Sequence, residues 1–116
     1  MTTDAVARLV ARAADLDAVL ARLTADEDAV RADRADATAD DEHDPEGSTL
    51  SGEWQRIEAL RRATASERAE VAAALERVDA GTYGICTVCG REIPAARLEA
   101  RPSATMCVPC AERVVR

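Results

Sequence analysis

The sequence predicts a mainly α-helical protein, in which an antiparallel two-helix coiled-coil hairpin precedes a small four-cysteine segment and a short terminal helix. Apolar side chains recur at alternating steps of three and four residues on both sides of one turn-rich stretch. All four cysteines fall within one window near the C-terminus. The 116 residues include one Trp, one Tyr and no Phe, too few large side chains for a thick core.

The first helix is expected over residues 3 to about 38. Gly and Pro are absent until Pro45, and Ala and Arg, both strong helix formers, fill much of the surface. Glu27 is the one polar interruption of the apolar seam. The seam consists of Val6, Leu9, Ala13, Leu16, Leu20, Leu23 and Val30.

Residues 40–49 break this pattern, because Asp-Pro and Glu-Gly favour turns and Ser48 or Thr49 can cap a following helix. A second seam follows at once and ends at Gly81, a residue type common just beyond a helix C-terminus. The seam consists of Leu50, Trp54, Ile57, Thr64, Val71, Leu75 and Val78, with Arg61 and Arg68 at its polar positions. We therefore expect a hairpin domain over residues 1–80 with its tip at 40–49.

The register of this hairpin follows from the position of the turn. Two helices of similar length joined by a short turn should pack antiparallel. If the turn is centred near residues 43–44, Glu27 lies opposite Arg61, and Val30 lies opposite Ile57. We predict a mostly exposed ion pair between Glu27 and Arg61, which would add about 0–1 kcal/mol and help to fix the register.

The cysteines form two C-x-x-C pairs separated by 17 residues. Structural Zn²⁺ takes four tetrahedral ligands, commonly cysteine sulfurs, and each short pair can place two sulfurs on one ion. The spacer leaves room for a small hairpin, Gly90 suits a tight knuckle, and residues 108–116 should form a short helix. We predict one structural zinc in a four-cysteine zinc finger over residues 81–116, with the ligands Cys86, Cys89, Cys107 and Cys110.

Disulfides and redox-active pairs are the alternative interpretations of the cysteines. We find no signal peptide or transmembrane stretch and expect a cytoplasmic location, where reducing conditions disfavour disulfides. A redox pair requires a βαβ scaffold that lowers one thiol pKa, and none is visible around Cys86. A closed four-cysteine shell leaves no position for substrate, so we expect no catalytic residues and no enzymatic activity.

Charge is distributed unevenly along the chain. The net charge of −7 disfavours a nucleic-acid partner held by phosphate contacts, and no membrane partner is expected. Residues 24–53 carry eleven acidic and two basic side chains. The tip of the hairpin, at residues 40–49, lies within this acidic stretch. It could approach a bound Mg²⁺ or a basic channel lining, or it could be a solvated turn. Its candidate partner-binding residues are Asp40, Asp41, Asp44 and Glu46.

Three arginines lie between the cysteine pairs, namely Arg91, Arg97 and Arg101. A zinc ion with four thiolates is anionic, so nearby guanidinium groups would offset its charge. The same arginines could instead form a positive surface for a partner. Both interpretations remain open from the sequence.

The stretch GTYGICTVCGREIPAARLEARPSATMCVPC resembles the zinc finger of the DksA/TraR family of bacterial transcription factors. The Y-G-x-C-x-x-C-G opening, the R-L-E-A-R-P middle and the C-x-x-C close carry the resemblance over residues 81–110, and the remainder matches in architecture. The resemblance implies a protein that binds RNA polymerase rather than DNA. It also implies a coiled coil that enters the secondary channel, with its acidic tip directed at the active centre, and an effect on initiation.

The chain departs from the family pattern at two places. The best-studied members carry D-x-x-D-x-A at the tip, whereas this chain keeps Asp44 but has Gly47 and Thr49 at the other positions. Some members bind guanosine tetraphosphate through basic residues around the zinc finger. Arg101 matches one such position, but Ala111 stands where a basic residue is expected, so we do not predict strong nucleotide dependence.

Two other functions fit the same sequence features. A transcript-cleavage-type factor would use Asp41 and Asp44 to position Mg²⁺ at the tip. A zinc-ribbon nucleic-acid-binding module would bind duplex DNA in a salt-dependent manner.

Overall fold

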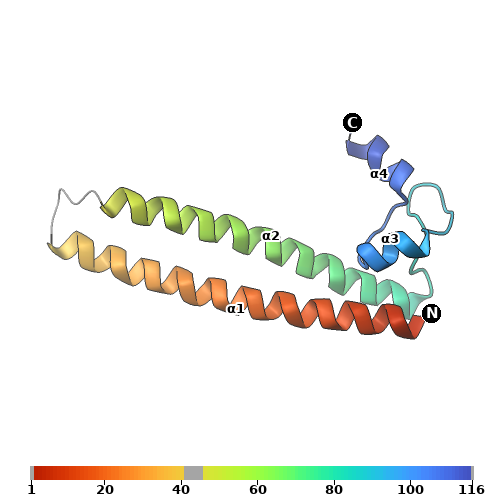
Figure 1. Cartoon of the computed structure of the whole chain (residues 1–116), viewed down its shortest axis with the longest axis horizontal. Helices are drawn as coiled ribbons and strands as arrows, with labels where there is room; N and C mark the ends of the chain where they lie inside the picture. The colour runs from red at the N-terminus through yellow and green to blue at the C-terminus, as the bar shows by residue number, and fades with distance from the viewer. Residues whose placement is uncertain (1, 41–45, 116) are drawn as a thin grey trace. The chain divides into compact units, whose positions relative to one another are not determined.

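The computed structural model describes residues 2–40 and 46–115, and the side chains of residues 3–36 and 51–114. It contains four helices in chain order (Figure 1): α1 (Thr2–Asp40), α2 (Glu46–Ala80), α3 (Ala95–Ala100) and α4 (Val108–Val115). The described residues form no strand, only one isolated antiparallel bridge between Ile85 and Glu92. The predicted fold class, a long helical pair with a cysteine cluster and a short terminal helix, is confirmed.

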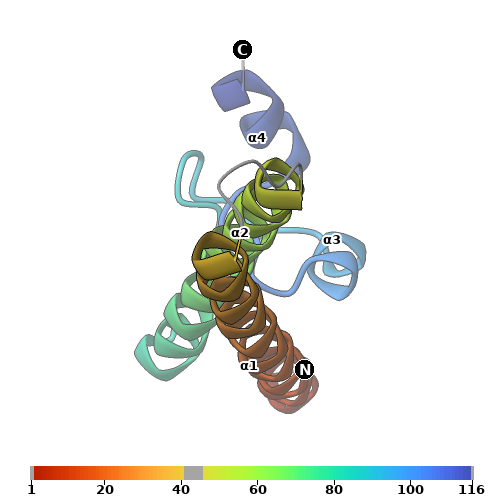
Figure 2. The same ribbon diagram turned by 90° about the vertical axis from the view of Figure 1, so that its left-hand side faces the viewer.

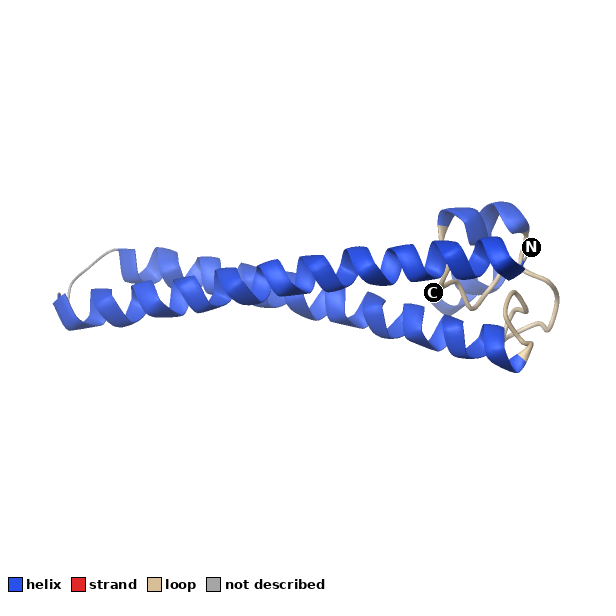
Figure 3. Cartoon of the chain, turned by 90° about the horizontal axis from the view of Figure 1, so that it is seen from below, coloured by secondary structure: helices blue, strands red, loops and turns tan. Residues whose placement is uncertain are grey.

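The chain divides into two compact units, each of which contains part of both long helices. We call Met1–Ala14 with Arg68–Arg116 the cysteine unit, and Asp15–Glu67 the helical unit. Within each unit the stretches of α1 and α2 run side by side in opposite directions, as Figure 3 shows. The predicted antiparallel pairing therefore holds within both units.

The core of the helical unit follows the predicted seam. Leu16, Val30 and Ile57 are buried, and the Nε atom of Arg61 lies 3.4 Å from Oε2 of Glu27. The predicted Glu27–Arg61 pair, and with it the register in this unit, is confirmed. The expectation that the pair is mostly exposed is wrong for Glu27, whose side chain is only 11% exposed, because its seam position faces the neighbouring helix.

In the cysteine unit, small and apolar side chains of α1 and α2 are buried together. The buried positions are Ala5, Leu9, Ala13, Val71 and Ala74. The short helices α3 and α4 belong to the same unit and lie apart from each other (Figure 2). Ala residues at this seam let the two long helices approach without a thick core.

Helix α2 ends at Ala80, and Gly81 follows it directly, as predicted. The φ angle of Gly81 is +79°, a left-handed conformation that residues with a Cβ rarely adopt. The amide of Gly81 donates to the carbonyl of Val78 (3.2 Å), and the amide of Thr82 donates to that of Arg77 (2.9 Å). This pair of hydrogen bonds is the Schellman motif, which satisfies the last carbonyls of the helix and turns the chain toward the cysteines.

The start of α2 and the structure of the spacer between the cysteine pairs differ from the sequence predictions. Helix α2 begins at Glu46 rather than after Ser48 or Thr49, and the sequence Pro45-Glu46 suits a helix start because proline and acidic residues favour the first turn. The spacer between the cysteine pairs forms α3 instead of a hairpin. Pro94 precedes the good helix-forming sequence AARLEA, which explains the helix there.

In the part of the chain that the structure describes, none of the helices has an apolar stretch long enough to cross a bilayer.

Candidate metal centre

The four cysteine sulfurs meet at one point of the cysteine unit. The Sγ atoms of Cys86, Cys89, Cys107 and Cys110 all lie within 4.8 Å of one another. The Sγ atoms of Cys89 and Cys107 are 3.9 Å apart, and none of the four residues forms a disulfide. A Zn–S distance of ~2.3 Å places the sulfurs of a tetrahedral site about 3.8 Å apart. The spacing therefore fits one tetrahedral ion and does not fit a disulfide.

The cluster also supplies much of the local core. Cys86 and Cys110 are each 1% exposed, whereas Cys107 is half-buried and Cys89 is exposed. Ile93 is buried with them, and Leu98 and Met106 pack against this group. Because so few apolar side chains surround the sulfurs, a bound metal would provide most of the cross-linking in this segment.

The first knuckle is held by its backbone. The amide of Cys86 donates to the carbonyl of Arg91 (2.8 Å), and the amide of Gly90 donates to that of Cys86 (3.0 Å). Gly90 has a φ of +75°, which lets the chain reverse directly after Cys89. The Cys89 amide points at the Cys86 sulfur, at 3.5 Å. The predicted tight knuckle, with a backbone N–H directed at sulfur, is confirmed.

The second knuckle starts a helix and is tied to the first. The amide of Thr87 donates to the carbonyl of Thr105 at 2.9 Å. Cys110 lies in the first turn of α4, and the amide of Ala111 donates to the carbonyl of Cys107 at 3.0 Å. Each knuckle thus brings its two sulfurs together locally, and the contact between the knuckles brings the pairs together.

The thiols differ in acidity because their surroundings differ. The backbone amide of Cys89, followed by that of Cys107, lowers the pKa of Cys86 to about 6. The neighbouring Cys107 thiol and burial raise the pKa of Cys110 to about 12. The Cys86 thiolate is therefore stabilised by backbone donors, whereas ionisation of Cys110 is opposed by the neighbouring thiol and by burial. A divalent cation would remove that opposition, as expected for a metal-ligand set.

The arginines near the cluster have different contacts. Arg97 donates from Nε to the carbonyl of Met106 at 2.6 Å, which supports the chain just before Cys107. Nη2 of Arg101 lies 3.9 Å from a carboxylate oxygen of Glu70, and Arg91 is exposed. Arg113, which sequence reasoning did not select, donates from Nη2 to the Cys110 sulfur at 3.3 Å. Arg113 lies three residues after Cys110 on an expected helix, and this spacing could have indicated the contact between their side chains.

The predicted tip residues lie at or beyond the limits of the described structure. Asp41 and Asp44 fall in residues 41–45, outside the described residues. Asp40 ends α1 and Glu46 begins α2, and their side chains are not among those described. Their proposed role as partner-binding residues therefore stays a prediction.

Comparison with known proteins agrees with the geometry of the cysteine cluster. Residues 81–116 match the family described as the prokaryotic dksA/traR C4-type zinc finger. This match covers the segment that contains all four cysteines. The resemblance found in the sequence is confirmed there, and the four converging sulfurs are its C4 set.

Two curated relatives each match about a third of the chain. The RNA polymerase-binding transcription factor DksA of Caulobacter vibrioides (strain NA1000 / CB15N) is 58% identical over 40 residues, which are 34% of this chain and 28% of that protein. The protein of the same name from Haemophilus influenzae is 44% identical over 41 residues, which are 35% of this chain and 28% of that protein. The matches thus span less than a third of these relatives' length.

A solved structure is similar in fold over most of the chain. The transcription factor DksA2 from Pseudomonas aeruginosa superposes with a TM-score of 0.57 and 24% identity, covering 93% of this chain and 83% of that one. At this identity the match concerns the fold. It supports the combination of a long helical pair with a cysteine-rich segment.

Proposed function

We propose that this protein is a non-catalytic, zinc-stabilised transcription regulator that binds RNA polymerase in the cytoplasm. The observation that carries the proposal is the convergence of four sulfurs within a dksA/traR C4-type segment. Two relatives that match over about a third of the chain are named as RNA polymerase-binding transcription factors. A net charge of −7 also favours a protein partner over direct binding to DNA.

The proposed cofactor is one structural Zn²⁺ held by Cys86, Cys89, Cys107 and Cys110. Zinc would supply the cross-link between the two knuckles and would offset the thiolate charge. The chain itself contributes the Cys89 amide, which points at the Cys86 sulfur, and the Arg113 guanidinium, which contacts the Cys110 sulfur. We propose a division of roles between a hairpin domain (residues 1–80) and this zinc finger (residues 81–116).

In this proposal the hairpin enters the secondary channel and directs its acidic tip at the active centre. The concentration of acidic residues in 24–53 supports this, since carboxylates favour the neighbourhood of Mg²⁺ and of basic channel walls. The tip residues proposed to act there are Asp40, Asp41, Asp44 and Glu46. On the zinc-finger face, Arg91, Arg97 and Arg101 are proposed to contact the partner. Of these, Arg91 is exposed, whereas Arg97 and Arg101 already have contacts within the chain.

A pull-down with RNA polymerase core, repeated after zinc removal, tests the proposal. We expect the zinc-loaded protein to bind and the chelator-treated protein to bind less. Asp44→Asn should retain binding but lose most of the effect on initiation in an in vitro transcription assay. Failure of the zinc-loaded chain to bind the polymerase would contradict the proposal.

Two further assays separate the alternatives. Stimulated RNA cleavage in backtracked polymerase complexes would favour a transcript-cleavage-type factor. Salt-dependent binding of the isolated protein to duplex DNA would favour a zinc-ribbon nucleic-acid module. Titration of the polymerase complex with guanosine tetraphosphate, for which we expect little effect, tests the substitution of Ala111 for a basic residue.

A further inference from the structure

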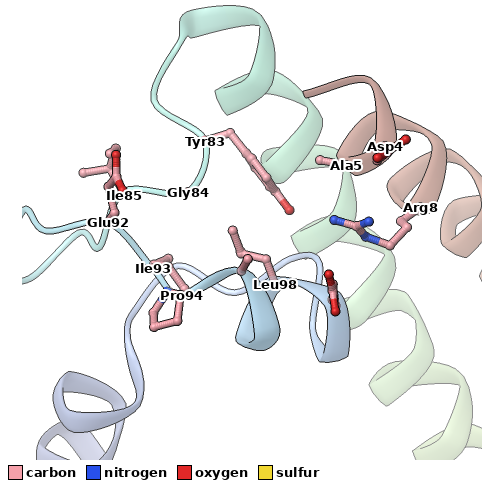
Figure 4. Close-up of a pocket in the computed structure, with 12 residues that line it drawn as sticks. Asp4, Ala5, Arg8, Tyr83, Gly84, Ile85, Glu92, Ile93, Pro94 and Leu98 are labelled. Atoms are coloured by element: carbon pink, nitrogen blue, oxygen red, sulfur yellow. The ribbon is translucent and has the colours of Figure 1, made fainter. Parts of the chain in front are cut away.

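A pocket of about 570 Å³ lies within the cysteine unit, away from the sulfurs. The start of α1 forms one side of it, and residues from Tyr83 to Glu99 form the rest (Figure 4). Its volume is in the range of known ligand sites, which is roughly 300–1,000 Å³. The proposed zinc site and the tip make no use of this pocket.

Arg8 places an unsatisfied hydrogen-bond donor at the pocket. Its Nε atom is buried and has no hydrogen-bond partner in the described structure. Figure 4 shows the guanidinium directed from α1 toward Tyr83 and Leu98. The Tyr83 hydroxyl donates to the carbonyl of Pro102 at 2.7 Å, and it does not accept a hydrogen bond from this Nε atom. An arginine carries five N–H donors in all, so a ligand in the pocket that offers an acceptor oxygen to this guanidinium would be favoured.

Carboxylates at the pocket restrict the charge of that ligand. Asp4, Glu92 and Glu99 all line the pocket and are exposed, against the single cation of Arg8. A polyanion such as a nucleotide triphosphate would be repelled by three carboxylates. The favoured ligand therefore combines a neutral acceptor oxygen with one or more positive groups.

The rest of the pocket is apolar. Ile93 is buried, Leu98 is half-buried, and Ala5, Pro94 and the Tyr83 ring complete the lining. One branched aliphatic side chain would bury apolar surface here, which favours binding. A peptide supplies all three features, namely an aliphatic side chain, carbonyl acceptors and basic neighbours.

We propose that this pocket binds a peptide segment of a protein partner in which an aliphatic residue is flanked by Lys or Arg. A peptide carbonyl accepts from Arg8, the aliphatic side chain lies on Leu98 and Ile93, and the basic side chains face Asp4, Glu92 and Glu99. The proposal does not depend on the partner being RNA polymerase.

The test is an NMR titration of the ¹⁵N-labelled, zinc-loaded full chain with two capped tripeptides. The probe acetyl-Lys-Leu-Lys-amide should shift the amides of Gly84, Ile93 and Leu98, and acetyl-Glu-Leu-Glu-amide should not. Equal shifts from both peptides, or none from either, would overturn the proposal. Shifts of the same amides with protein concentration alone, without peptide, would assign the pocket to a second copy of the chain and would also overturn it.

Matched variants show which side chains are responsible. Arg8→Met keeps the aliphatic stem but removes the donor, and we expect weaker peptide binding with no loss of thermal stability. Glu99→Gln should weaken binding of the lysine peptide about two- to fivefold, since one exposed ion pair is lost. Arg22→Met, on the exposed surface of the helical unit, is the control and should bind like the unmodified chain. Unchanged binding by Arg8→Met would contradict the assigned role of Arg8.

Discussion

Each of the two units brings together side chains that would repel one another when ionised, and the two units differ in the source of the opposite charge. In the cysteine unit, four ionisable thiols converge, and two of them are almost completely buried. In the helical unit, the carboxyl groups of Glu27 and Glu58 meet with side chains only 11% and 14% exposed. Arg61 approaches both carboxylates, at 3.4 Å from Glu27 and 3.0 Å from Glu58. The counter-charge is thus part of the chain in the helical unit, whereas in the cysteine unit it would come from the proposed metal ion.

This difference shows how the source of the counter-charge determines what each unit responds to. A guanidinium is always present and always charged, so the carboxyl pair depends on pH through the carboxyls alone. A metal ion can be removed, so with the proposed zinc site the folding of the cysteine segment would depend on the supply of that ion. Experiments on each unit can separate the dependence on pH from the dependence on metal.

The largest effect is expected from the loss of one sulfur ligand. Cys89→Ser should release zinc and unfold residues 81–116 while much of the helix in residues 1–80 remains, because structural zinc contributes about 10–16 kcal/mol of binding free energy in small domains. Elemental analysis and far-ultraviolet circular dichroism measure both quantities. The control is Val88→Ser in the same knuckle, where Val88 is 58% exposed, and it should keep its zinc. Full zinc content in the Cys89 variant would contradict the four-ligand site.

The second effect concerns the internal counter-charge. Arg61→Met should lower the urea midpoint of the helical transition, because Glu27 and Glu58 would lose the cation that both contact. Arg62→Met is the matched control, since Arg62 is 78% exposed and, of these two carboxylates, contacts Glu58, at 3.3 Å. Addition of a chelator should not change the difference between the two variants. Equal midpoints for the two would show that the Arg61 contacts do not stabilise the unit.

The third effect is a pH dependence with opposite signs for the two carboxyls. A hydrogen bond shared with Glu58, together with burial, raises the pKa of Glu27, so folding disfavours its charged form. Hydrogen bonds from Arg61, and then with Glu27, lower the pKa of Glu58 to about 2, so folding favours its charged form. The contribution of protonated Glu27 is present below its ordinary pKa of 4.5 and is lost as pH rises through the raised value. The contribution of ionised Glu58 is present above pH 4.5 and is lost as pH falls toward 2.

Two substitutions measure these signs. At pH 7 we expect Glu27→Gln to raise the free energy of unfolding and Glu58→Gln to lower it. The Glu27 difference should shrink as pH falls toward 4.5, and the Glu58 difference should shrink between pH 4.5 and 2. Urea denaturation at pH 7, 4.5 and 3 provides the comparison. The same sign for both variants at pH 7 would contradict the assigned pKa directions.

The smallest effects are expected from the substitution of two glycines by alanine, one in each unit. Gly81→Ala should destabilise the cysteine unit by about 1–2 kcal/mol, because φ is +79° there and a Cβ is strained in that conformation. Gly52→Ala should stabilise the helical unit by about 0.5–1 kcal/mol, because Gly52 lies inside α2 with open space at its Cβ position. Thermal unfolding of both variants measures the difference. A stabilising Gly81→Ala would contradict the role of Gly81 as the helix stop.

Much of this structure was predictable because it depends on local spacing. The three/four periodicity of apolar residues specified both long helices, and the length of the turn placed Glu27 opposite Arg61. The C-x-x-C spacing identified the sulfur set, since two residues between cysteines bring their sulfurs to one ion. Gly81 was recognisable as a helix stop because few other residues tolerate its backbone conformation. Each of these features is determined within a few residues of sequence or by one turn.

Other features were decided by the tertiary structure. The burial of Glu27 and its hydrogen bond with Glu58 depend on how closely two helices approach, which periodicity does not report. The spacer helix α3 was missed because strong helix formers over six residues are marginal without packing partners such as those of Leu98. The pocket around Arg8 joins residues some eighty positions apart in the chain. Sequence by itself determined which residues face inward and which sulfurs can meet, because these follow from backbone geometry. Only tertiary packing decided which charges lose their water, because desolvation depends on neighbours distant in the chain.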